Sequence, residues 1–142
     1  MRRMVRTCAA LVAGACLGAA QQVPEGVHRE ATGPAVMCGV AGEGALDLLA
    51  KARASSELRP VAIDTPRFIL FADGSHSRQL IFTNPTEAAY PAATCRHVYE
   101  ADGALHTSRQ MRCDAGREEC DALFLEFQAL DAEMTRALRG GN

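Results

Sequence analysis

The C-terminal part of the chain carries the pattern that most constrains its fold. Between Arg117 and Arg139, apolar residues recur every three or four positions, as a helix with one apolar face requires. They are Cys120, Leu123, Phe124, Phe127, Leu130, Met134 and Leu138. The glycines at 140 and 141 favour a helix end there. A long helix of this kind needs a second layer to cover its apolar face.

The preceding segments predict that this layer is an antiparallel sheet. RFILF (67–71) and RQLIF (78–82) read as strands around the turn ADGSHS, and segments 95–99 and 104–111 read as strands around EADG. Residues 44–56 have the composition of a short helix. We therefore expect an α+β fold: an antiparallel sheet of about four strands in two hairpins, packed against a long C-terminal helix, with both helices on one sheet face.

The N-terminus predicts export. Residues 1–20 combine three arginines, an uncharged apolar run and a small-residue exit, which are the parts of a signal peptide. The run is shorter than the roughly 20 residues that span a bilayer, so no stable membrane span is expected after cleavage. Lipid attachment at Cys16 is the alternative. The expected location is periplasmic or secreted.

Cleavage near Ala20 defines the mature chain. Residues 21–43 are rich in glycine and proline and read as an irregular lead-in, of which only AVMCGV is expected to pack. Residues 44–142 then form a single α+β domain. The signal segment removes three of the 15 basic residues and none of the 17 acidic ones, which leaves a net charge of −5. Such a chain lacks the basic surface that nucleic-acid binding needs.

Four cysteines remain in the mature chain: Cys38, Cys95, Cys113 and Cys120. In an oxidising compartment, four cysteines predict two disulfides in one of three pairings. We favour Cys113–Cys120, which would pin the corner between the last strand and the helix, and Cys38–Cys95, which would tie the lead-in to the sheet. No C-x-x-C spacing supports a zinc or redox site, so no metal and no cofactor are predicted.

The segment TCRHVYEADGALHTSRQMRC (94–113) holds the candidate binding residues His97, Tyr99, His106 and Ser108. If Asp102 and Gly103 form a two-residue turn, these four side chains share one polar face. A three-residue turn would shift the register and place the two histidines on opposite faces. Both registers remain open at this level. No carboxylate lies on the polar face and the chain has no G-x-S-x-G motif, so no catalytic residue is predicted.

Two further features single out residues elsewhere. The connection TNPTEAAYPAAT is long for a link between strands, so Asn84 and Tyr90 are candidates for a recognition edge, against the alternative of a crossover packed by Tyr90. Asp131 lies inside the apolar stripe of the last helix, where a buried carboxylate needs a partner. Arg96 or Arg109 is expected to provide it.

The sequence as a whole favours a small exported protein-binding domain without catalytic activity, of the inhibitor, immunity or accessory-factor type. Its acidic last helix would suit a basic protein partner. The alternatives are a small-ligand or metal-binding protein, or a small hydrolase, each using the His97 and His106 face.

Overall fold

The computed structural model describes residues 33–140, and within them the chain forms two helices and two antiparallel sheets. The larger sheet has five strands in the order β3–β4–β5–β6–β7, and the smaller pairs β1 with β2. The strands are β1 Ala35–Met37, β2 Val40–Gly42, β3 Arg59–Val61, β4 Phe68–Ala72, β5 Arg78–Thr83, β6 Ala92–Ala101 and β7 Ala104–Cys113. The helices are α1 Ala45–Ala54 and α2 Arg117–Gly140. The α+β class is confirmed.

The expected sheet of about four strands was too small. The strand that was not predicted is β3, which contains Pro60; proline is tolerated on an edge strand, and β3 is the edge of this sheet. β1 and β2 form a hairpin inside the predicted irregular lead-in, in the residues that were expected to pack. Cys38 and Gly39 link them with positive φ angles of 52° and 86°, the backbone conformation of a tight two-residue turn.

The predicted signal peptide at residues 1–20, the alternative lipid site Cys16 and the lead-in up to residue 32 lie outside the described residues.

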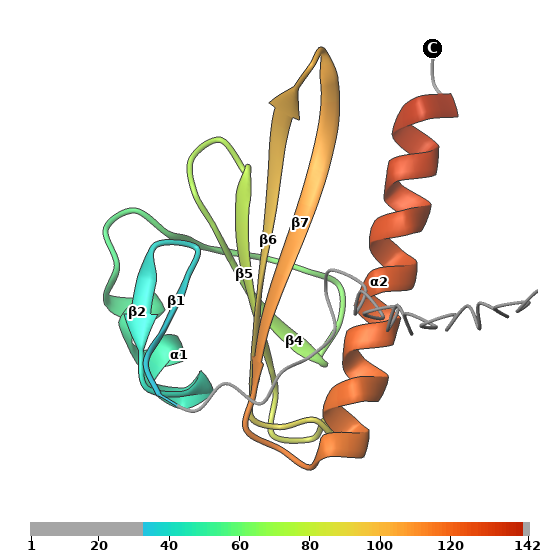
Figure 1. Ribbon diagram of the computed structural model, residues 1–142. Helices are drawn as coiled ribbons and strands as arrows, with labels where there is room; N and C mark the ends of the chain where they lie inside the picture. Colours follow the sequence, from blue (N-terminus) through green and yellow to red (C-terminus); the bar gives the residue numbers. More distant parts are fainter. Residues whose placement is uncertain (1–32, 141–142) are drawn as a thin grey trace, which may run out of the picture.

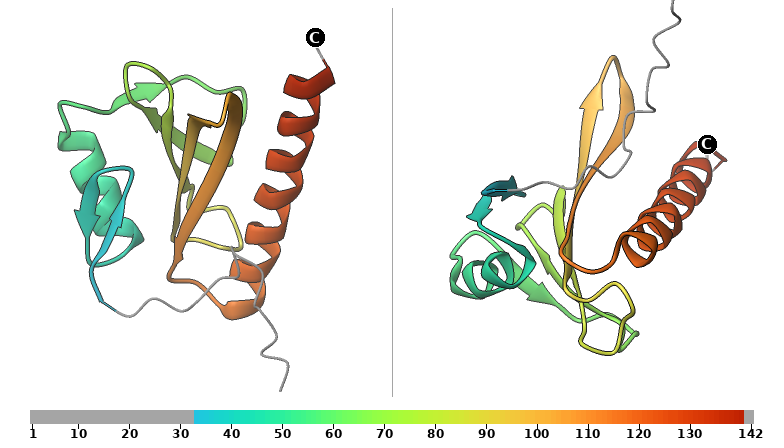
Figure 2. Two further views of the ribbon diagram at one scale, coloured as in Figure 1. Left: turned by 45° about the horizontal axis from the view of Figure 1, so that its top comes forward. Right: turned by 60° about the horizontal axis from the view of Figure 1, so that its bottom comes forward.

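The two helices lie on opposite faces of the five-stranded sheet (Figure 1 and Figure 2). α1 and the β1–β2 hairpin cover one face, and α2 covers the other. The expectation that both helices share a face was therefore wrong. The reason lies in β4 and β5, whose apolar residues are consecutive rather than alternating, so that both faces of these strands need cover.

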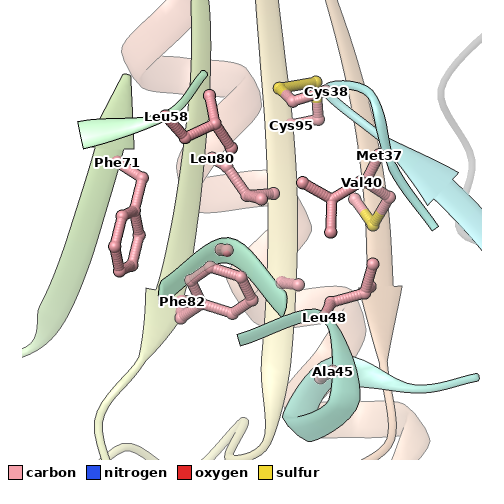
Figure 3. Packing of buried hydrophobic residues seen from close by; sticks show 12 residues of the cluster. Met37, Cys38, Val40, Ala45, Leu48, Leu58, Phe71, Leu80, Phe82 and Cys95 are labelled. Atoms are coloured by element: carbon pink, nitrogen blue, oxygen red, sulfur yellow. A yellow bond between two sulfur atoms is a disulfide. The ribbon is translucent and has the colours of Figure 1, made fainter. Parts of the chain in front are cut away.

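The core beneath α1 gathers side chains from every layer on that side (Figure 3). Leu48 of α1 and Leu80 of β5 are both 0 % exposed. Phe71 and Phe82 meet edge to face, with ring centroids 6.0 Å apart. Burying side chains of this size contributes about 1.5–3 kcal/mol each, so these residues fix α1 and the small sheet on their face.

The opposite core lies under only the first half of α2. Cys120, Leu123 and Phe127 are buried, and the Phe127 ring lies 5.5 Å from that of Phe68 in β4. Further along the same helix, Leu130 and Met134 are 45 % and 37 % exposed, although they continue the apolar stripe. The apolar packing of α2 on the sheet is therefore concentrated in the first half of the helix.

Both favoured disulfides are present. Cys38 of the β1–β2 turn is bonded to Cys95 of β6, and Cys113 at the end of β7 is bonded to Cys120 in the first turn of α2. The first bridge attaches the small sheet to one face of the large one and the second attaches α2 to the other face. Each face thus has its own covalent link.

Candidate functional site

The β6–β7 hairpin extends beyond the rest of the sheet as a projecting arm (Figure 1). β6 and β7 pair along their whole length, from Ala92 opposite Cys113 to Ala101 opposite Ala104. β5 ends its pairing with β6 where Arg78 faces His97, followed by one further bond from Val98 N–H to the Ser77 carbonyl oxygen. Residues 98–107, which we call the arm, therefore project past the neighbouring strand.

The turn of the arm decides which side chains lie together. Asp102 and Gly103 have φ angles of 52° and 72°, as a two-residue type I′ turn requires. This turn places Tyr99 opposite His106 and His97 opposite Ser108. The two-residue register is thus the correct one, and the three-residue alternative is excluded.

The four predicted binding residues of the hairpin consequently share one face. The ring centroids of His97 and Tyr99 lie 5.3 Å apart, and those of Tyr99 and His106 lie 5.6 Å apart in a stacked arrangement. All three rings are exposed, Tyr99 to 41 %. We call His97, Tyr99 and His106 the ring row. Cross-strand aromatic packing of this kind orders side chains that are otherwise surrounded by water.

A shallow hollow of about 250 Å³ adjoins the ring row at the base of the arm. Its lining comes from the β1–β2 hairpin on one side and from β5, β6 and β7 on the other: Val36, Cys38, Gly39, Arg78, Cys95, His97, Ser108 and Gln110. Val36, at the rim of the hollow, is 66 % exposed. The Cys38–Cys95 bridge holds the two walls at a fixed separation.

The chemistry available at this face is recognition by stacking and hydrogen bonding. Among the described residues, no hydrogen bond joins Ser108 to His97, and the lining of the hollow contains no carboxylate to orient a histidine base. His106 Nε2 lies 3.2 Å from the carbonyl oxygen of Ala101. No group of three or more metal-ligating side chains occurs within residues 33–140.

Asn84 and Tyr90 are not part of this face. They lie in the connection from β5 to β6, at the end of the sheet opposite the arm, because β5 runs away from the arm. Asn84 donates from Nδ2 to the carbonyl oxygen of Pro66, and its backbone N–H donates to the carbonyl oxygen of Arg67. Thr83 Oγ1, at the end of β5, accepts from the Ala92 N–H at the start of β6 and so closes this connection. The six candidate residues therefore fall into two separate groups.

The opposite face of the hairpin carries a buried ion cluster. Arg109 donates to both carboxylate oxygens of Asp131 at 2.6 and 2.7 Å, and Arg96 Nε lies 3.2 Å from Asp131 Oδ1. The expected partnership of Asp131 with Arg96 or Arg109 is confirmed, since it pairs with both. The side chains of both arginines are 6 % exposed and that of Asp131 is 15 % exposed.

This cluster carries more positive than negative charge. Two guanidinium groups share one carboxylate, and burial lowers the pKa of Arg96, opposed by the attraction of Asp131. Arg109 also lies over the Phe127 ring, 4.5 Å from its centroid, and donates to Thr94 Oγ1. The position of Asp131 within an apolar stripe predicted the ion pair, but no sequence signal indicated that a second arginine would join it.

Comparison with known proteins assigns no family. No protein-family model matches the chain, and no curated protein or solved structure matches it significantly. In the part of the chain that the structure describes, no helix is both long and apolar enough to cross a membrane.

Proposed function

We propose that this chain is a small exported domain, stapled by two disulfides, that binds another protein through the ring row and has no catalytic activity of its own. The observation that carries the proposal is the ring row itself. Three exposed rings lie in a row, Tyr99 and His106 on the arm and His97 at its base, beside the exposed Val36. Tyrosine is enriched at protein interfaces because it offers a large apolar body with one polar group.

The dimensions of the site favour a protein over a small ligand. Pockets for small molecules usually enclose about 300–1,000 Å³, whereas the hollow beside the ring row is shallow and holds about 250 Å³. A protein surface would contact the rings, the hollow and Val36 together. The metal-binding alternative has less support, because the ring contacts join each imidazole to Tyr99 rather than to the other imidazole.

Export is supported by the cysteines. The four that follow the proposed signal peptide are all paired in disulfides, a state typical of periplasmic and secreted proteins. A partner with a basic region would additionally complement the exposed acids of α2, among them Glu118, Glu119 and Glu133.

Site-directed photo-crosslinking tests the proposal. A photoreactive phenylalanine analogue replaces Tyr99 in the exported protein, and a matched probe replaces Leu46, a 52 % exposed residue on α1. After illumination of the periplasmic and secreted fractions, the Tyr99 probe should capture one defined protein that the Leu46 probe does not. Capture of the same proteins by both probes, or of none, would refute the proposal.

The captured protein then allows an affinity measurement. Tyr99→Ala should weaken its binding by about thirtyfold, as expected for a central interface tyrosine, while Leu46→Ala leaves the affinity unchanged. Binding that depends on added zinc and is lost on chelation would favour the metal alternative instead.

A further inference from the structure

A second surface of the hairpin lies along the outer edge of β7. Within residues 33–140, β7 is the last strand of the five-stranded sheet and no strand pairs with its outer side. A hollow of about 570 Å³ runs along this edge, and four consecutive residues of β7, Thr107 to Gln110, line it together with Tyr99 of β6 and with Phe124, Gln128 and Asp131 of α2. Consecutive strand residues point to opposite faces, so a hollow touching all four lies against the strand edge.

The register shows which backbone groups face this hollow. Residues that flank a two-residue hairpin turn form a hydrogen-bonded pair, and such pairs then alternate along the strands. His106, Ser108 and Gln110 therefore bond to β6, and Leu105, Thr107, Arg109 and Met111 direct their N–H and C=O groups outward. The hydrogen bond from the Val98 N–H to the Ser77 carbonyl oxygen agrees with this alternation. It shows that the backbone groups of Val98, and so of the other even-numbered residues of β6, face β5 and not β7.

The charges around the edge indicate what it would accept. Arg96 and Arg109 outnumber Asp131, so the buried cluster beneath the edge keeps one positive charge. Arg136 lines an adjoining hollow of about 450 Å³ that shares Thr107 and Asp131 with the first. Within residues 33–140 no ion pair joins Arg136 to a carboxylate, and its Nε donates to the carbonyl oxygen of Ala132.

We propose, building on the function proposed above, that the outer edge of β7 accepts an extended segment of the partner protein as a sixth strand, with an aspartate or glutamate side chain directed toward the exposed Arg136. Strand addition supplies affinity through backbone hydrogen bonds and specificity through alternate side chains. A second copy of this chain does not meet the charge requirement by pairing β7 with β7, because residues 104–113 contain no acid.

The test uses two variants with matched controls. Thr107→Pro removes an outward N–H without removing a bond between β6 and β7, and Thr107→Val keeps that N–H. Arg136→Gln removes a positive charge at the edge, and Arg53→Gln removes one from the exposed surface of α1. Thermal unfolding first confirms that each variant is folded.

The probe is a phage-displayed library of random linear peptides, selected against the disulfide-bonded mature protein. Enriched peptides should be rich in β-branched residues and carry one aspartate or glutamate. Thr107→Pro should weaken their binding about tenfold or more, and Arg136→Gln about three- to fivefold at low salt. The two control variants should bind as the unmodified protein does. Peptides that bind the Thr107→Pro protein equally well would overturn the proposal.

Amide hydrogen exchange provides an independent readout. In the free protein the N–H groups of Thr107, Arg109 and Met111 should exchange quickly, and peptide binding should protect them. Protection already present in the free protein would mean that this chain covers its own edge. A dimer in light scattering that Thr107→Pro dissociates would mean that a second copy covers it. Either result overturns the proposal.

The outcome is separable from that of the proposed function. If the protein captured at Tyr99 binds the Thr107→Pro variant with unchanged affinity, the edge inference fails and the ring-row function stands. If Tyr99→Ala has no effect on that affinity while Thr107→Pro abolishes binding, the edge inference stands and the ring row is not the contact.

Discussion

At the scale of single residues, Asp131 holds the α2 side of the sheet together electrostatically. Within residues 33–140 it is the one carboxylate that contacts both buried arginines, and Arg109 in turn covers the Phe127 ring. Removing one partner from a buried ion pair leaves the other charge uncompensated, which costs more than the pair itself contributes. The cluster should therefore be sensitive to the loss of this single side chain.

We expect Asp131→Ala to lower the free energy of unfolding by about 3 kcal/mol, because two desolvated guanidinium groups would lose their counter-charge. Urea denaturation monitored by circular dichroism measures the change. Glu133→Ala, an exposed acid on the same helix, is the control and should alter stability by less than about 0.5 kcal/mol. Equal effects of the two substitutions would contradict a special role for Asp131.

Asp73 gives the protein an acid-sensitive turn. Partial burial by itself raises the pKa of this carboxyl, but hydrogen bonds from the Arg78 N–H, the Ser77 hydroxyl, the Arg78 guanidinium and the Ser75 hydroxyl outweigh that effect and lower the pKa to about 2. A depressed folded-state pKa stabilises the fold above the unfolded value of 3.8, and this contribution is lost as the pH falls through about 2.

Asp73→Asn should therefore destabilise the protein most at neutral pH. The stability difference between the variant and the unmodified protein should narrow as the pH falls from about 4 to about 2, since both side chains are then uncharged. Urea unfolding across a pH series measures it. A difference that stays constant over this range would show that the charge of Asp73 is not what the turn requires.

At the scale of secondary-structure elements, the arm depends on the conformation of its turn. Gly103 has a φ of 72° and Gly74, in the turn between β4 and β5, has no positive φ, yet a side chain added at either position would meet open space. Alanine substitutions at these two positions therefore differ in backbone strain but not in steric crowding.

Gly103→Ala should destabilise the protein by about 1 kcal/mol because a side chain disfavours the left-handed conformation. Gly74→Ala should be neutral or stabilise by a few tenths of a kcal/mol, since it restricts the unfolded chain without strain. Thermal unfolding compares the two variants. The same decrease in both would show that the turn does not rely on left-handed backbone at residue 103.

The elements also show what the sequence could and could not predict. The period of α2, the two main hairpins and the ion pair of Asp131 were predictable because local spacing determines them. The consecutive apolar residues in RFILF and RQLIF indicated a sheet covered on both faces. The prediction that both helices share one face rested on the general rule that an antiparallel sheet leaves its other face in water, and this sheet does not follow that rule. The helix at 44–56 was predicted and α1 covers Ala45–Ala54. The bond from the Ala45 N–H to Asp114 at 2.7 Å could not be predicted, because it spans 69 residues.

The candidate site was predictable in part for the same reason. The residue types of the ring row were evident from the sequence, and their grouping required only the correct choice between two turn registers. The separation of Asn84 and Tyr90 from the ring row could not be foreseen, since it depends on the direction in which β5 runs relative to the arm. The open edge of β7 depends on strand order, which no local pattern specifies.

At the scale of the whole molecule, each face of the sheet is closed by its own layer and its own disulfide. Cys38–Cys95 spans 57 residues and Cys113–Cys120 spans seven. In the chain-entropy model, closing loops of these lengths stabilises the fold by about 4 and about 2.5 kcal/mol. The longer bridge should therefore contribute more to global stability.

Replacing Cys38 and Cys95 together by alanine should lower the free energy of unfolding by more than replacing Cys113 and Cys120 together, by about 1.5 kcal/mol. Guanidinium denaturation of the two double variants measures the difference. Hydrogen exchange should locate the first effect in β1, β2 and α1 and the second at the start of α2. A larger loss from the Cys113 and Cys120 pair would contradict the entropic reasoning.

The order of the cysteines along the chain has a consequence for how the molecule is made. Each bridge joins two cysteines that are neighbours in the series Cys38, Cys95, Cys113 and Cys120. If residues 1–20 are removed as predicted, an oxidant that joins the four remaining thiols in the order in which they emerge during synthesis would form both native bonds directly. We therefore expect correct pairing to need no isomerase, because no bond has to be broken and made again.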